Sequence, residues 1–174
     1  MNKNKIKLSS YLIYVLGCLT LLISFYFNID GTGAPLSGDF IETWPYVLKL
    51  TNSFFFDPSQ WTLHFPLHYY FLSKLNIIFS DARDVRLIFC LICFITPYFF
   101  YLCLKNKYKE KKHDTLFILS AIILFTPSYI YSAIWANDNN TSYIFILTGS
   151  YFFFKYVNLD NNINKNHIFL YSSF

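Results

Sequence analysis

The stretch LIFCLICFITPYFFYLCL, residues 87–104, contains no charged side chain, and the stretch KNKYKEKKHD, residues 105–114, follows it with five lysines. An apolar helix of about 20 residues is long enough to cross the ~30 Å hydrocarbon core of a bilayer. Lysines gathered at the end of such a helix indicate its cytoplasmic side. Together the two stretches predict a membrane protein and set the orientation of its helices.

The composition of the whole chain agrees with this class. Hydrophobic residues make up 55% of the 174 residues, aromatic residues 22% and charged residues only 14%. Soluble domains carry about 25% charged residues, so an ordinary soluble protein is excluded. All four cysteines fall inside apolar runs, and we expect Cys90 and Cys93 to face lipid, without a metal or disulfide role.

Four apolar stretches are predicted to span the membrane, at about 11–28, 87–104, 115–135 and 143–157. Three lysines precede the first stretch and no small-residue cleavage site follows it, so we interpret it as an uncleaved helix. A further apolar run begins at residue 168 and is cut off by the end of the sequence, which suggests a truncated span. The predicted fold is all-α, a polytopic helical membrane protein forming one membrane domain over residues 1–174.

Residues 29–86 are predicted to form one long outer loop. If the N-terminus and the lysines of 105–112 are both cytoplasmic, the first helix runs outward and 87–104 returns inward. Within this loop, residues 65–79 form a short apolar run interrupted by His68, Lys74 and Asn76, which favours an interfacial helix over a spanning one. The alternative, a crossing at 65–79, would place the five lysines outside. The same reasoning puts the polar turn around Asp138 on the outer side.

Three acidic residues lie in these outer segments. Asp39 and Glu42 are spaced i, i+3, so on a helix they share one face and can converge on one ligand. A structural interpretation is also open, because an acid in the first turn of a helix interacts favourably with the helix dipole. Asp138 lies in the polar sequence NDNN between two apolar runs, where a polar turn needs no function.

Two histidines and two arginines are further candidates. His64 and His68 have i, i+4 spacing, but no nearby Cys or Glu completes a metal site, and we expect His64 to hydrogen-bond a polar headgroup. Arg83 and Arg86 can contact a phosphate through their guanidinium groups, or can simply extend toward the membrane surface. No catalytic Ser/His/Asp arrangement, glycine-rich phosphate loop or nucleic-acid-binding patch is recognisable, since membrane topology explains the lysines of 105–112.

The order of these motifs is more informative than any one of them. An acidic D-x-x-E (Asp39 to Glu42) follows the first span, then HFPLHYY (His64 to Tyr70), an Arg-Leu pair at 86–87, FTPSYIYS (125–132) and the acid Asp138. This order resembles the N-terminal part of the membrane glycosyltransferases of the GT-C fold that use polyprenyl-phosphate sugars, of the protein O-mannosyltransferase and aminoarabinose-transferase type.

The resemblance implies roles for particular residues. Asp39 matches the catalytic base and Asp138 the second-loop acid, while Glu42 stands two positions later than the usual partner acid. His64 and Tyr69 match the substrate-binding H-P-P-L-Y-Y stretch, in which Phe65 replaces the first proline. Arg83 or Arg86 would hold the departing phosphate.

The implied donor is a sugar on polyprenyl phosphate. The implied acceptor is a lipid, glycan or protein at the outer face of the cell inner membrane, in envelope glycan or lipopolysaccharide assembly. No cofactor and no nucleic acid are expected, and a divalent metal is left open. The alternatives are a polysaccharide polymerase or flippase component, which would be expected to use outer-loop arginines, and an inactive truncated fragment.

Overall fold

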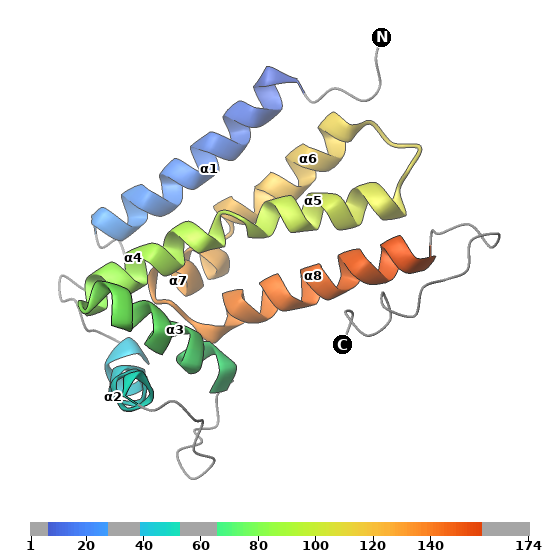
Figure 1. Cartoon of the computed structure of the whole chain (residues 1–174). Coiled ribbons are helices and arrows are strands. Elements are labelled where there is room, and N and C mark those ends of the chain that lie inside the picture. The colour runs from blue at the N-terminus through green and yellow to red at the C-terminus, as the bar shows by residue number, and fades with distance from the viewer. Residues whose placement is uncertain (1–6, 28–38, 53–65, 158–174) are drawn as a thin grey trace. The chain divides into compact units, whose positions relative to one another are not determined.

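A computed structural model describes residues 7–27, 39–52 and 66–157, and the regular structure in these ranges is helical, without a β-strand (Figure 1). The all-α prediction is therefore confirmed for the described residues. The helices are α1 (Leu8–Tyr26), α2 (Asp39–Thr51), α3 (Pro66–Phe79), α4 (Ala82–Cys93), α5 (Thr96–Lys107), α6 (His113–Ala121), the 3-10 helix η2 (Ile122–Phe125), α7 (Pro127–Ile134) and α8 (Asp138–Val157).

Within the described residues, two helical segments are long and apolar enough to cross a membrane, α1 and the combined segment Ala82–Lys107. A third is added if His113–Phe125 and Pro127–Ile134 count as one span. These segments overlap most of the predicted spans at 11–28 and 115–135 and all of that at 87–104. The fourth predicted span, 143–157, is helical in α8, but α8 is not among the candidates because its first turn is polar (Asp138 to Ser142) and Lys155 lies near its end.

The predicted span 115–135 is not one straight helix. The helix is interrupted at Thr126, which has an extended backbone (φ −79°, ψ 129°). Pro127 explains the break, since proline has no N–H to donate and its ring disfavours the helical conformation in the preceding residue.

The predicted outer loop 29–86 contains two described helices, α2 and α3, and the first turn of α4. The interfacial helix expected at 65–79 is present as α3, whereas α2 was anticipated only through the spacing of its acids. Helix α4 begins at Ala82, five residues before the predicted start at 87, so Arg83 and Arg86 belong to the helix. His64 and the apolar run from 168 lie outside the described residues.

The chain separates into two compact units, one comprising residues 1–20, 94–126 and 142–174, the other 21–93 and 127–141. The second unit contains the contacts of α2 with α3, α3 with α4 and α4 with α7. Its core consists of side chains with no more than 1% exposure, contributed by these helices: Phe40, Val47, Leu72, Val85, Phe89 and Cys90. The expectation that Cys90 and Cys93 face lipid is wrong, since both are fully buried within the protein.

The first unit is built around helices α5 and α6, which pack against each other. Tyr101, Leu116 and Phe117 form its buried cluster, and the half-buried Tyr14 of α1 packs against them. Farther along α1, Gly17 approaches η2 so closely that a Cβ atom on it would lie 2.7 Å from the Cβ atom of Leu124. The absence of a side chain at Gly17 is thus a requirement of this packing.

Candidate functional site

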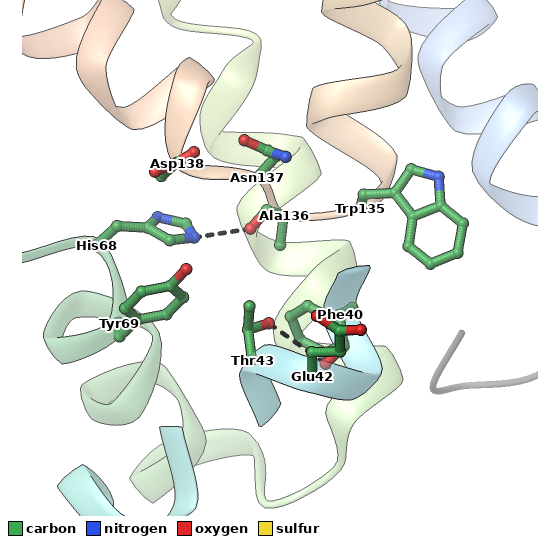
Figure 2. A pocket seen from close by; sticks show the side chains of 9 residues that line it. All are labelled: Phe40, Glu42, Thr43, His68, Tyr69, Trp135, Ala136, Asn137 and Asp138. Atoms are coloured by element: carbon green, nitrogen blue, oxygen red, sulfur yellow. Dashed lines mark hydrogen bonds between the residues drawn. The ribbon is translucent and has the colours of Figure 1, made fainter. Parts of the chain in front are cut away.

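The second unit contains a pocket of about 170 Å³ formed by α2, α3 and the connection between α7 and α8 (Figure 2). Its volume corresponds to about five or six water molecules, taking ~30 Å³ for each, so it has room for one small polar group such as a single sugar ring. The residues that line it are Phe40, Glu42, Thr43, His68, Tyr69, Trp135, Ala136, Asn137 and Asp138.

The pocket brings together two of the three predicted catalytic acids, although they are far apart in the sequence. Glu42 lies on α2, one turn after its first residue Asp39, and is exposed. Asp138 is the first residue of α8 and is partly buried. Figure 2 shows Asp138 and Glu42 at opposite edges of the pocket view. The side chain of Asp39 lies outside the described part of the structure.

His68 is held in the pocket wall by hydrogen bonds at both ring nitrogens. It is 1% exposed, with Nε2 at 2.7 Å from the carbonyl oxygen of Ala136 and Nδ1 at 2.8 Å from the hydroxyl oxygen of Thr141. A carbonyl only accepts, so Nε2–H donates to Ala136 and Nδ1 accepts from Thr141. Burial lowers the pKa of His68 from 6.5 to about 4, against smaller opposing effects of the Ala136 carbonyl and the Asp138 charge. His68 is therefore neutral at physiological pH.

The chain turns sharply at Ala136, between α7 and α8. Ala136 has a positive φ of 49°. The N–H of Asn137 donates to the carbonyl of Ser132 at 2.9 Å, and the N–H of Ala136 donates to the carbonyl of Ala133 at a longer 3.4 Å. This is the hydrogen-bond pattern of a Schellman motif, which usually has glycine in the left-handed position. The hydrogen bond from His68 thus anchors a conformation that alanine adopts reluctantly.

The start of α8 positions Asp138 directly after this turn. Asn137 precedes the helix, and its side-chain oxygen accepts the backbone N–H of Asn139 at 3.1 Å, as an N-cap does. Asp138 in the first turn is favoured by the helix dipole. The NDNN sequence therefore caps α8 and also places Asp138 in the pocket, so the structural and the functional interpretation are compatible.

Tyr69 and the aromatic residues supply the rest of the lining. Tyr69, predicted to bind substrate, is 5% exposed and lines the pocket next to His68, with the two ring centroids 5.3 Å apart. Phe40 and Trp135, which were not predicted, are also almost fully buried lining residues. Aromatic rings beside carboxylates suit a sugar, because the rings pack on its C–H faces while the acids bind hydroxyl groups.

The two predicted phosphate-binding arginines are not part of the lining. Arg86 is 3% exposed, its Nε donates to the carbonyl of Ile134 at 2.9 Å, and its guanidinium lies 4.9–5.7 Å from three ring centroids, those of Phe25, Phe40 and Trp135. These contacts make it a core residue behind the pocket. Arg83 is exposed in the first turn of α4, next to Asp81, whose carboxylate accepts its backbone N–H.

Little in the sequence indicates a role for His68. Its i, i+4 spacing from His64 suggested only a weak metal site, and the described residues hold no group of three or more His, Cys, Asp or Glu side chains suited to a metal. The useful signal was the position of His68 in an otherwise apolar helical run, where a polar side chain needs a buried partner. Comparison of the chain with protein-family models, curated proteins and solved structures finds no match.

Proposed function

We propose that this chain is the N-terminal membrane region of a glycosyltransferase that takes a sugar from polyprenyl phosphate. The observation that carries the proposal is the pocket itself, which Glu42 of α2 and Asp138 of α8 line together with Tyr69. The order of motifs in the sequence points to the same two acids and the same tyrosine. The GT-C architecture and the multi-pass location in the cell inner membrane are parts of this proposal.

The proposed reaction needs a general base and polar side chains that bind the sugar and the acceptor. The acceptor hydroxyl oxygen attacks the anomeric carbon, the bond from that carbon to the phosphate oxygen breaks, and its electron pair leaves with polyprenyl phosphate. The hydroxyl proton goes to Asp39, the residue that the resemblance identifies as the base; such a group contributes about 10²–10⁴-fold. Glu42 and Asp138 would bind hydroxyl groups of the sugar and acceptor and orient them toward the base.

The composition of the pocket distinguishes this proposal from a polymerase or flippase component. Such a component would be expected to use arginines, whereas the described pocket lining contains two carboxylates and no arginine or lysine. With Arg86 engaged in the core, Arg83 at the exposed start of α4 is the better candidate for the donor phosphate.

A direct test uses the chain in lipid nanodiscs with a panel of polyprenyl-phosphate sugars and membrane extract as the source of acceptor. Release of polyprenyl phosphate is measured, since it reports turnover whichever acceptor is used, and donor binding is measured by tryptophan fluorescence. We expect Asp39→Asn to lower kcat and Asp138→Asn and Glu42→Gln to raise KM. Glu110→Gln, in the exposed α5–α6 loop, is the matched control. Absence of both donor binding and turnover, or equal rates in all variants, would refute the proposal.

The proposed orientation has its own test. In a cysteine-free background, single cysteines at positions 38, 110 and 139 are labelled in intact cells with a membrane-impermeant thiol reagent. Position 139 is preferred to 137 because Asn139 is exposed, whereas Asn137 caps α8. Labelling at 38 and 139 but not at 110 is expected. Labelling at 110 would place the lysine-rich loop outside and contradict the proposed orientation.

A further inference from the structure

A dense basic patch covers the end of the α5–α6 hairpin in the first unit. Five lysines lie within residues 105–112, and all five are exposed: Lys105, Lys107, Lys109, Lys111 and Lys112. Glu110 is the one acidic residue in this stretch of the sequence, which leaves five positive charges against one negative charge. We call residues 105–112 the lysine loop.

The nearest acid after the loop is engaged elsewhere. The carboxylate of Asp114, at the start of α6, accepts hydrogen bonds from the hydroxyl of Ser10 and, at 3.1 Å, from the backbone N–H of Lys7. These bonds tie the start of α1 to the start of α6 and bring the exposed Lys7 to the same end of this unit. Lys7 therefore adds a positive charge near the loop, and the negative charge of Asp114 is directed toward the start of α1.

The lysine loop begins where a long apolar helix ends. The segment Ala82–Lys107 is one of the two described segments able to cross a membrane, and Lys105 and Lys107 form its last turn. Tyr108, which follows directly, is 44% exposed, and the Nζ of Lys107 lies 5.8 Å from the centroid of its ring. Lysines and an exposed tyrosine at the end of an apolar helix are the residues found at the level of lipid headgroups.

We propose that the lysine loop, together with Lys7, is a docking surface for anionic phospholipid headgroups. The loop directly follows the end of the candidate membrane-crossing segment. Its ammonium groups therefore lie at the membrane surface, at the level of the headgroup phosphates. Each lysine close to an anionic surface strengthens its attraction about fivefold, and the effect decays within a Debye length of about 10 Å in 0.1 M salt. This surface is independent of the acidic pocket and of the proposed transferase activity.

The test measures the relative association of spin-labelled phosphatidylglycerol and phosphatidylcholine with the full chain in bilayers, by electron paramagnetic resonance. Wild type should prefer the anionic lipid by at least about fivefold, the contribution of one lysine, and 0.5 M salt should reduce the preference. Changing the five loop lysines and Lys7 to glutamine should abolish it. Changing the same six to arginine keeps the charges and should retain it, which separates a charge effect from a loss of folding.

Three results would overturn the proposal. These are equal association of the two lipids with wild type, a preference unchanged in the glutamine variant, and a preference lost in the arginine variant although the helix content is retained. Binding of a short RNA in phosphatidylcholine bilayers, with no preference for phosphatidylglycerol, would overturn it in favour of a nucleic-acid surface.

Discussion

Replacing His68 by phenylalanine removes both hydrogen bonds of the imidazole while keeping a ring in a position that is 1% exposed. A buried polar group left without a partner costs about 1–3 kcal/mol. The hydroxyl of Thr141 can instead donate to a backbone carbonyl one helical turn earlier, as the hydroxyl of Thr148 does to Ile144. Most of the lost free energy therefore comes from the carbonyl of Ala136, which is left without its hydrogen bond from His68. We expect His68→Phe to lower the free energy of unfolding by about 2–3 kcal/mol.

For a chain of 174 residues, 1 kcal/mol shifts Tm by about 2–4 °C, so the expected loss is roughly 4–12 °C. Tm is measured in mild detergent by tryptophan fluorescence. Thr141→Val should cost less, and the double variant should show a coupling energy of about 1 kcal/mol, because both substitutions break one shared hydrogen bond. A Tm for His68→Phe within 2 °C of wild type, or strict additivity in the cycle, would refute the assigned role of His68.

The same residue makes a prediction about pH. Burial lowers the pKa of His68 from 6.5 to about 4 in the folded chain, so the unfolded chain binds more protons between these values. The stabilisation that depends on a neutral His68 is complete above pH 6.5 and is lost as the pH falls toward 4. The pKa difference between the unfolded and folded chain corresponds to about 3 kcal/mol, at 1.36 kcal/mol per pH unit. The Tm advantage of wild type over His68→Phe should therefore shrink between pH 7 and pH 4.5, whereas an advantage independent of pH would contradict the reasoning.

Three further substitutions test the packing by Tm. Gly17→Ala should destabilise by about 1–2 kcal/mol despite the helix preference of alanine, because its Cβ would clash with Leu124; the exposed Ser9→Ala on the same helix is the control. Ala136→Gly should stabilise by about 0.5–1 kcal/mol, since glycine accepts the φ of 49°, and a lower Tm would show that the turn differs. Arg86→Lys should cost about 1–3 kcal/mol, because lysine lacks the Nε donor to Ile134 and the planar group between the rings. An unchanged Tm for Arg86→Lys would mean that the guanidinium is not a core group.

The site was only partly predictable from the sequence. The motif order predicts Glu42, Asp138 and Tyr69 as site residues, and all three line one pocket in the structure. His68 was considered only as a weak metal ligand, because spacing cannot show whether a buried histidine has hydrogen-bond partners. Arg86 was predicted to bind phosphate, and its actual neighbours come from α1, α2 and the residues that follow α7.

The sequence by itself determined which segments are helical and apolar, since these properties depend on residues adjacent along the chain. The helices over most of the four predicted spans, the α3 helix and the break before Pro127 all have local causes. Only the tertiary structure decided that Glu42 and Asp138 share a pocket, that Cys90 and Cys93 are buried, and that His68 supports the turn at Ala136. The physical reason is that these properties depend on packing between α2, α3, α4 and α7. When packing brings two distant residues together, the residues next to each of them in the sequence do not reveal that contact.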